Sequence, residues 1–162
     1  MKKISEQIIK KLITLKLTIA TCESMTGGLL ANKLVEIEHA SSVFLGGYVS
    51  YSKKSKINIV GVDEKIVANY GTISQQCANE MAKKTQAKFD SDIAISITGN
   101  ASLKNPDENK QSGIAYITIY IFDRKYDFFY QKQFATNRNE IQYECTLFVL
   151  NKFWSIIRQY KK

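Results

Sequence analysis

The sequence of 162 residues has little of several residue types that define whole classes of protein. It contains one proline and eight glycines, which excludes a collagen-like chain and a Pro/Gly-rich disordered chain. No apolar run approaches the ~18 residues of a membrane-spanning helix, and Lys2 and Lys3 interrupt the start before a secretory apolar stretch can form. Neither a repeat nor a Gly/Ser-rich linker divides the chain. We therefore expect one domain over residues 1–162, in the cytoplasm and without a membrane partner.

Metal-binding and redox patterns are also absent. The cysteines Cys22, Cys77 and Cys145 lie far apart, and neither a CxxC pair nor a zinc-like Cys/His spacing occurs. His39 is the only histidine, and it falls in a predicted surface loop. We expect three reduced thiols, no metal site and no catalysis by histidine.

The common phosphate-binding and nucleophile motifs are missing as well. The chain has no GxxxxGK[ST] loop, no GxGxxG fingerprint, no GxSxG elbow and no HExxH helix. An SxxK string occurs at 50–53, but it ends a predicted strand, and the SDN and KTG partners of a penicillin-binding site are absent. Any enzymatic activity must therefore come from a different arrangement of residues.

The chain is basic, with 23 Lys and Arg against 15 Asp and Glu and a formal net charge of +8. A basic surface favours anionic partners, which include phosphorylated metabolites, nucleic acid and acidic membranes. Most lysines are scattered, and the only obvious cluster is Lys53, Lys54 and Lys56. Scattered charge is typical of an ordinary solvated surface. The charge alone therefore does not select a partner.

Hydrophobic periodicity predicts alternating helices and strands. Apolar residues at helical spacing open the chain, and a buried strand over 17–22 is followed by a tight turn and a helix. The remaining predicted elements are a strand at 42–52, short helices at 53–59 and 63–70, a helix capped by Ser74, strands at 92–98, 113–122 and 126–134, and a final helix after Asn137. This order predicts an α/β protein, a three-layer α/β/α sandwich with a mixed, mostly parallel sheet.

Ligands in such sheets bind beyond the carboxyl ends of the strands. In this sequence those positions are 23–28, 51–56 and 98–99. Ser24 stands where a strand stops and a helix starts, so unpaired helical N–H groups would point toward it, and Gly27 and Gly28 would let a ligand approach the backbone. Such donors suit a bound anion or the oxyanion of an acyl-transfer intermediate. The alternative is that Ser24 or Thr26 only caps the helix.

A serine nucleophile needs a base, and with a single histidine the candidates are Lys, Glu and Asp. Lys56 acts as a base if burial, or positive charge on Lys53 and Lys54, lowers its pKa. The alternative is an exposed lysine of ordinary pKa. Thr98 and Gly99 end a third strand, and they either add a hydroxyl and bare backbone to the same cleft or form an ordinary strand terminus.

Several strings occur together and in a characteristic order. They are Glu23-Ser24-Met25-Thr26-Gly27-Gly28, Phe44-Leu45-Gly46-Gly47 with Tyr51 and Lys56 following, Ser74, Ile97-Thr98-Gly99, Gly113 and Arg138. In this combination the chain resembles, nearly end to end, the C-terminal domain of the competence/damage-inducible protein CinA, a family that also occurs as a stand-alone nicotinamide-nucleotide amidase. The resemblance implies an α/β/α sandwich that hydrolyses nicotinamide mononucleotide to nicotinate mononucleotide and ammonia through a serine–lysine pair, with no metal or other cofactor.

The resemblance also implies roles for individual residues. Ser24 falls on the nucleophile and Lys56 on the general base, and Tyr51 and Thr98 fall on residues that assist or orient them. The implied substrate-binding residues are Thr26, Gly27, Gly28, Gly46, Gly47, Gly99 and Arg138, the last as a phosphate or structural contact. Backbone N–H groups at the start of the 25–38 helix would stabilise the oxyanion. The expected partner is a phosphorylated nucleotide substrate, and we expect a homo-oligomer such as a dimer.

Some positions depart from the family pattern. Residues 100–105 replace a Gly-rich loop, and non-Gly residues resist positive φ. Ile114 replaces a common threonine, Gln142 a common basic residue, and Met25 a cysteine or another small residue. One alternative is therefore a nucleotide-binding or regulatory domain of the same family that has lost turnover.

A basic nucleic-acid-binding module is the other alternative. Its affinity would fall steeply with salt and survive Ser24→Ala, because phosphate contacts dominate such binding. The aromatic run at 126–130 would then be a base-stacking platform. A half-buried strand, with Phe128 and Tyr130 on one face and Phe129 on the other, explains the run better. Nucleic acid is therefore not the partner we expect.

Overall fold

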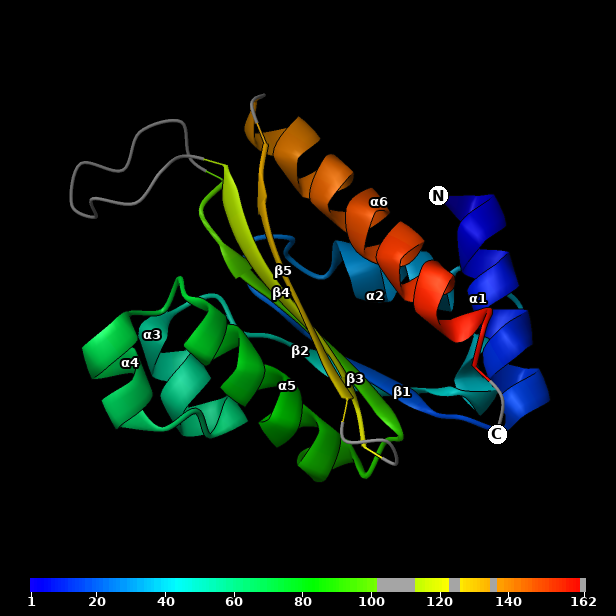
Figure 1. Ribbon diagram of the computed structural model, residues 1–162, viewed down its shortest axis with the longest axis horizontal. Helices are drawn as coiled ribbons and strands as arrows, with labels where there is room; N and C mark the ends of the chain where they lie inside the picture. The colour runs from blue at the N-terminus through cyan, green and yellow to red at the C-terminus, as the bar shows by residue number, and fades with distance from the viewer. Residues whose placement is uncertain (102–112, 123–125, 135–136, 161–162) are drawn as a thin grey trace.

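A five-stranded sheet with the strand order β2-β1-β3-β4-β5 forms the centre of the structure (Figure 1). Its strands are β1 (Ile19–Glu23), β2 (Phe44–Val49), β3 (Ile93–Gly99), β4 (Ile114–Ile121) and β5 (Tyr126–Gln133). They are rich in isoleucine and aromatic residues, which favour extended backbone. The computed structural model describes residues 1–101, 113–122, 126–134 and 137–160.

The sheet is mixed, as predicted. β1 pairs in parallel with both β2 and β3, whereas β4 pairs antiparallel with β3 and β5. Among the described strands, only β4 therefore runs against the rest. The parallel pairs require helical crossovers, while antiparallel strands such as β4 and β5 can be joined by a short connection. The predicted turn of that hairpin, 123–125, lies outside the described residues.

Helices cover both faces of the sheet and confirm the predicted α/β/α sandwich (Figure 1). One face carries α1 (Lys2–Leu15), α2 (Leu29–Val35) and α6 (Arg138–Ile157); the other carries α3 (Lys53–Ser55), the π-helical turn η2 (Lys56–Val60), α4 (Glu64–Tyr70) and α5 (Gln75–Phe89). A short 3-10 turn, η1 (Ala40–Ser42), precedes β2. The predicted caps Ser74 and Asn137 are confirmed, because each side-chain oxygen accepts a hydrogen bond from the N–H three residues on. Within the described residues, no helix is both long and apolar enough to cross a membrane.

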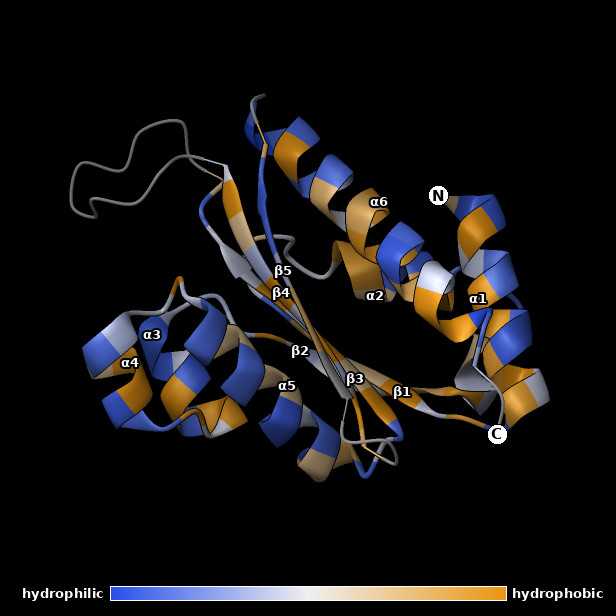
Figure 2. Cartoon of the chain, viewed as in Figure 1, coloured by the Kyte–Doolittle hydropathy of each residue, from blue (hydrophilic) through white to orange (hydrophobic). Residues whose placement is uncertain are grey.

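Two hydrophobic clusters make up the core. The larger one packs α1, α2 and α6 against the sheet, with Ile8, Leu12 and Phe153 fully buried. Ile8 and Leu12 are four residues apart and so lie on one face of α1. Figure 2 shows hydrophobic and hydrophilic residues alternating along α1 and α6 in the same way. The smaller cluster contains Cys22 of β1 and Cys77 of α5.

Two local features differ from the predicted elements. The turn predicted after β1 covers 24–28, so the helix expected over 25–38 is limited to Leu29–Val35. The helix predicted over 53–59 is divided in two: Ser52 caps α3 by accepting a hydrogen bond from the Ser55 N–H at 3.0 Å, and the wider turn η2 then begins at Lys56. Both differences lie at the carboxyl edge of the parallel strands, where the predicted site lies.

Candidate active site

Ser24 follows the last residue of β1 and is held by its backbone at the edge of the sheet. Its N–H donates to the Ile97 carbonyl of β3 at 2.9 Å, and its carbonyl accepts from the Gly27 N–H at 3.1 Å. The residue is 6% exposed and lines a cleft of about 210 Å³. Its hydroxyl therefore lies where ligands of parallel sheets usually bind.

Lys56 reaches the same cleft from η2 and is 1% exposed. Its Nζ lies 2.9 Å from Ser24 Oγ and donates to the Ser50 carbonyl at 2.5 Å. Ser50 is in turn tied to β1, because its N–H donates to the Glu23 carbonyl at 2.7 Å. The fold thus brings together a serine and a lysine that are 32 positions apart in the sequence.

Burial controls the protonation of this lysine. Removal of the ammonium from water lowers the pKa of Lys56 below its ordinary value of 10.5, and the neighbouring Cys77 and Cys22 oppose this effect more weakly. No carboxylate of the described residues forms an ion pair with Lys56. Burial also raises the pKa of the Cys22 thiol to about 12, so this thiol stays protonated and does not compete as a nucleophile. The pair can therefore act as nucleophile and base.

Glu23, the last residue of β1, organises the turn that carries Ser24. Its carboxylate is buried, at 1% exposure, and accepts four hydrogen bonds. The donors are Thr26 Oγ1 at 2.6 Å and the N–H groups of Gly28 at 3.1 Å, Leu30 at 3.0 Å and Ala31 at 2.8 Å. A carboxylate at this place also interacts favourably with the positive end of α2. The turn after Ser24 is therefore wrapped around a buried negative charge.

The prediction of free N–H donors at the start of the helix is wrong for the helix itself. Glu23 already binds the N–H groups of Leu30 and Ala31. The N–H groups of Met25 and Thr26, in the turn before α2, have no hydrogen-bond partner among the described residues. The N–H donors available beside Ser24 therefore belong to the turn, because the Glu23 carboxylate already accepts hydrogen bonds from the first N–H groups of α2.

The rim of the cleft joins two distant segments of the chain. Arg138, at the start of α6, donates from Nη2 to the Tyr51 hydroxyl at 2.6 Å, and both residues line the cleft. Tyr51 is 61% exposed, so much of its side chain faces solvent at the mouth of the cleft. The two side chains are placed to meet the solvent-facing end of a bound molecule.

Thr98 and Gly99, at the end of β3, also line the cleft. Thr98 is buried, and its hydroxyl donates to the Thr72 carbonyl at 2.7 Å. Gly99 has no side chain to keep Met25 away, and a Cβ here would overlap the Met25 sulfur and the Ile114 carbonyl. These residues therefore shape the cleft beside the turn that carries Ser24.

Five other predicted binding residues do not line the cleft: Thr26, Gly27, Gly28, Gly46 and Gly47. The first three belong to the turn around the Glu23 carboxylate, where Gly27 and Gly28 have φ of +64° and +94° that glycine adopts readily. The other two lie inside β2. A Cβ on Gly46 would come within 2.8 Å of the Phe89 ring, and one on Gly47 would overlap Thr21. Neighbouring protein atoms therefore fill the space beside both glycines of β2.

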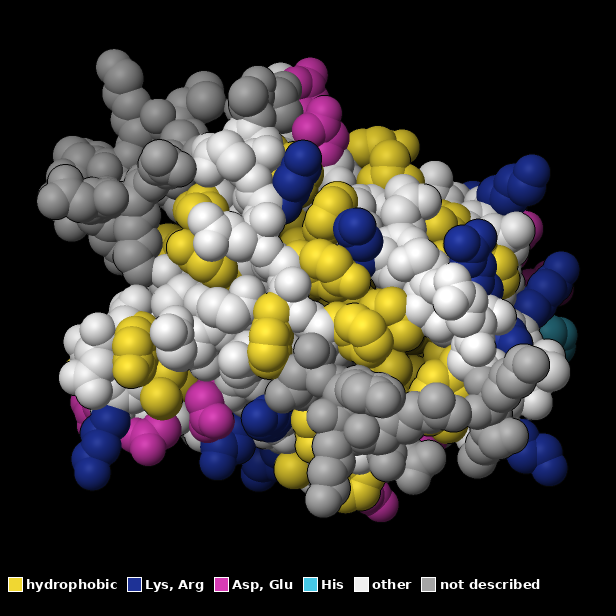
Figure 3. Space-filling model, viewed as in Figure 1, with side chains coloured by type: hydrophobic (Ala, Val, Ile, Leu, Met, Phe, Trp, Pro, Cys, Tyr) yellow, Lys and Arg dark blue, Asp and Glu magenta, His cyan; other side chains and the backbone are white. Residues whose placement is uncertain are grey.

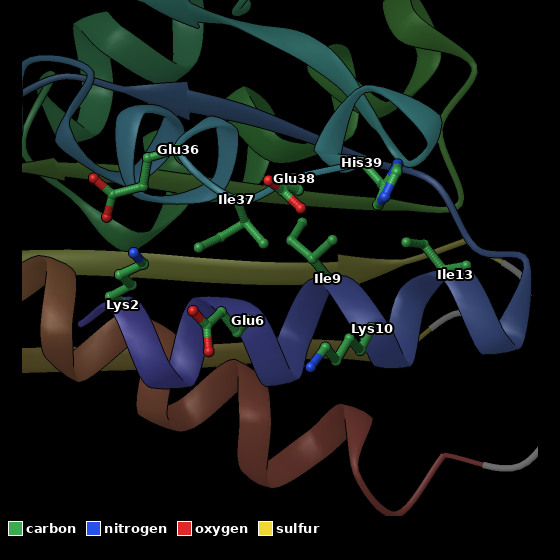
Figure 4. A pocket seen from close by; sticks show the side chains of 9 residues that line it. All are labelled: Lys2, Glu6, Ile9, Lys10, Ile13, Glu36, Ile37, Glu38 and His39. Atoms are coloured by element: carbon green, nitrogen blue, oxygen red, sulfur yellow. The ribbon is translucent and has the colours of Figure 1, made fainter.

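A second cavity, of about 430 Å³, lies between α1 and the segment that follows α2 (Figure 4). Ile9, Ile13 and Ile37 contribute apolar walls, and the other lining residues carry charges of both signs together with a histidine. No serine, threonine or cysteine lines this cavity. The smaller cleft, which holds the serine–lysine pair, is therefore the candidate active site.

Sequence reasoning did not identify three residues that shape the site. The position of Glu23 in the sequence could have indicated its role, because an acidic residue that ends a buried strand just before a helix can bind the free N–H groups of that helix. Ser50 contributes its backbone carbonyl, which no residue type reveals. Gln142 donates from Nε2 to the Met25 carbonyl at 2.7 Å, a contact between segments far apart in the sequence.

Comparisons with known proteins agree with this architecture. A profile of the family described as CinA C-terminal domain matches residues 1–157. The chain is 40% identical over 141 residues to Protein MG115 of Mycoplasma genitalium, an alignment that covers 87% of this chain and 87% of that protein. It is 35% identical over 147 residues to a CinA-like protein of a Sulfurihydrogenibium species, which covers 90% of this chain and 36% of that protein. The chain thus spans most of the first relative and about a third of the second.

Solved structures show the same fold. The competence damage-inducible protein A (ComA) from Klebsiella pneumoniae superposes with a TM-score of 0.93 over 99% of this chain and 98% of that chain, at 21% identity. A likeness at this level of identity shows a shared arrangement of helices and strands.

Proposed function

The chain belongs to the CinA C-terminal domain family, and we propose that it is an amidohydrolase that converts nicotinamide mononucleotide to nicotinate mononucleotide and ammonia. The observation that carries the proposal is the 2.9 Å contact between Ser24 Oγ and the buried Nζ of Lys56. A serine beside a lysine of lowered pKa suits acyl transfer. The family resemblance supports the choice of a carboxamide as the acyl donor.

In the first half-reaction, Ser24 Oγ attacks the carboxamide carbon while neutral Lys56 takes the hydroxyl proton. The former carbonyl oxygen becomes negative, and the N–H of Met25, which lines the cleft and has no partner among the described residues, is the donor available to it. The Lys56 ammonium then gives its proton to the nitrogen as the C–N bond breaks. Ammonia leaves, and the nicotinoyl group remains as an ester on Ser24.

In the second half-reaction, water attacks the ester carbon and Lys56 takes a proton from that water. The C–O bond to Ser24 then breaks, and the proton passes from Lys56 back to Ser24 Oγ. The products are free enzyme and nicotinate mononucleotide. The proton transfers of both halves thus use the same pair of side chains, 2.9 Å apart.

Arg138 and Tyr51 at the rim suit the phosphorylated end of this substrate. A guanidinium can bind a phosphate through two parallel N–H donors. Arg138 bonds a neutral hydroxyl and forms no ion pair with any described residue. Its charge is therefore available to an anionic ligand at the mouth of the cleft.

An assay of ammonia release from nicotinamide mononucleotide tests the proposal. We expect turnover by the wild type and a loss of about 10⁴-fold in kcat for Ser24→Ala, because the covalent route is removed. Ser155→Ala is the matched control and should retain the wild-type rate, since the Ser155 hydroxyl only donates to the Lys152 carbonyl within α6, at 2.7 Å. Tight binding of the nucleotide without ammonia release would favour a non-catalytic nucleotide-binding domain instead.

Arg138→Ala is expected to raise KM for nicotinamide mononucleotide by about tenfold to a hundredfold, because a hydrogen bond to a charged group is lost. KM for nicotinamide riboside, which lacks the phosphate, should change by no more than about twofold. Arg158→Ala, at the other end of α6, is the control and should leave both values unchanged. Equal losses with both substrates would contradict a phosphate contact.

The sequence also left open a nucleic-acid-binding module and a nucleotide-binding domain without turnover, and each predicts a different experimental result. On the face shown in Figure 3, Lys and Arg side chains are scattered and form no continuous basic patch, which does not favour a nucleic-acid-binding module. Salt-sensitive DNA binding that survives Ser24→Ala would support that module. Of the altered loop at 100–105, Asn100 and Ala101 line the cleft, and residues 102–105 lie outside the described residues. The ammonia assay measures the effect of this loop on turnover.

A further inference from the structure

Gln142 joins the last helix to the turn behind Ser24. Its Nε2 donates to the Met25 carbonyl at 2.7 Å, between residues that are 117 positions apart. Met25 is 2% exposed and lines the catalytic cleft. Gln142 belongs to α6, a helix of 20 residues whose inner face packs into the main core. The carbonyl is therefore held by a donor on a firmly packed element.

The carbonyl groups of this turn are bound, whereas the N–H groups that follow them are not. The Ser24 carbonyl accepts from the Gly27 N–H at 3.1 Å, and the Met25 carbonyl accepts from Gln142. In a trans peptide unit the N–H points away from the C=O of the same unit. Each bound carbonyl therefore fixes the direction of the next N–H, which belongs to Met25 in one case and to Thr26 in the other.

Buried N–H groups without a partner are rare in proteins. Met25 and Thr26 are both buried, and neither N–H has a partner among the described residues. Of the two residues, Met25 directly follows Ser24 and lines the cleft, so its N–H is the donor closest in the chain to the attacking oxygen.

We propose that Gln142 is a positioning residue for the oxyanion. By holding the Met25 carbonyl, it fixes the position of Met25, which lines the cleft, so that the Met25 N–H meets the oxygen that becomes negative when Ser24 attacks. The inference rests on the proposed function, because it requires acyl transfer at Ser24. It adds a residue of α6 to the machinery and assigns it an effect on the transition state.

Gln142→Leu tests the inference, because it removes the N–H donor at similar side-chain size. We expect kcat for nicotinamide mononucleotide to fall by about tenfold to a hundredfold and KM to stay within about twofold. The pH at which activity begins to rise should not move, since Lys56 is unchanged. Asn151→Leu is the matched control and should keep the wild-type kcat, because it deletes the same kind of bond, to the Leu147 carbonyl at 2.9 Å, on the exposed side of α6.

A second readout does not depend on the natural substrate. Acetylation of Ser24 by p-nitrophenyl acetate passes through a similar oxyanion, and intact-protein mass spectrometry follows it. We expect Gln142→Leu to slow acetylation by a similar factor, and Gln142→Lys, which keeps an N–H donor, to recover most of the rate. Recovery by the lysine variant would separate positioning from a general loss of structure.

The outcomes distinguish the inference from the proposed function. Acetylation of wild-type Ser24 that depends on Gln142, without ammonia release, would support the inference and reject the nucleotide substrate. Wild-type rates of both reactions in Gln142→Leu would overturn the inference and leave the proposed function intact. A higher KM with unchanged kcat would also overturn it. A Ser24 that reacts with neither compound would reject both.

Discussion

Lys56→Met is expected to lower kcat for ammonia release by at least about 10³-fold, because the group that accepts the Ser24 proton is lost. Methionine is a long, flexible apolar side chain that can fill the same space, so the loss should reflect the amine rather than packing. In the wild type, kcat/KM should rise with pH through the pKa of Lys56, which lies below 10.5. The residual activity of the variant should lack this rise. Initial rates from about pH 6 to about pH 10 provide the measurement.

Lys53→Met is the control for this experiment. Lys53 lies in the short helix α3 just before Lys56, and it is exposed. Its substitution should change kcat by no more than about twofold, because solvent and ions screen the charge of an exposed side chain. Similar losses in both variants would contradict a specific role for Lys56.

Lys56→Met is also expected to stabilise the fold near neutral pH, by about 1 kcal/mol. The folded state lowers the pKa of Lys56, so between that lowered pKa and the unfolded value of about 10.4 the unfolded chain binds more protons. Wild-type stability therefore rises with pH across this window, and the variant lacks this contribution. Urea unfolding should show a difference between the two proteins that shrinks as the pH approaches about 10.4. A difference that did not depend on pH would contradict the assigned cause.

Glu23→Ala is expected to lower the free energy of unfolding by about 3–5 kcal/mol, because several N–H groups in a largely buried turn lose their acceptor at once. The turn that carries Ser24 also loses the group around which it is wrapped, so turnover should fall even where the fold persists. Urea unfolding followed by circular dichroism measures the first effect, and ammonia release at low temperature measures the second.

Glu36→Ala is the matched control for Glu23→Ala. Glu36 follows α2 and forms an exposed ion pair with Lys33 at 3.0 Å. Loss of a surface pair of this kind changes the free energy of unfolding by about 0.5 kcal/mol or less. Similar losses of unfolding free energy in the two variants would show that the four hydrogen bonds of Glu23 stabilise the fold no more than a surface ion pair does.

The fold was predictable because its elements are encoded locally. The alternation over 92–98 marks a strand that the structure places at Ile93–Gly99, and Ser74 marks the start of α5. Strand ends were less predictable: the strand expected over 42–52 is limited to Phe44–Val49. Residues 50–52, Ser-Tyr-Ser, keep an aromatic residue typical of strands, but pairing with β1 stops at Val49, so composition alone does not locate the end of a strand.

The site was predictable only in part, because burial depends on the whole fold. Ser24 and Lys56 were identified from strand ends and family-like strings, but the sequence left open whether Lys56 is exposed. The turn η2 and the neighbouring apolar cluster decide that question. The contacts of Ser50 and Gln142 join segments through backbone carbonyls, so no pattern of side chains could indicate them.

The buried position of Lys56 affects the order in which ammonia and water pass through the site in the proposed reaction. Ser24 is 6% exposed and Lys56 is 1% exposed, so small molecules reach their reactive atoms only through the cleft. Ammonia and water are nearly the same size and need the same place next to Nζ. Water therefore enters only after ammonia has departed, and during that interval the acylated serine is open to whichever small nucleophile arrives first. Hydroxylamine is a small nucleophile of this kind, and its attack on the acylated serine would release the nicotinoyl group as a hydroxamate instead of an acid.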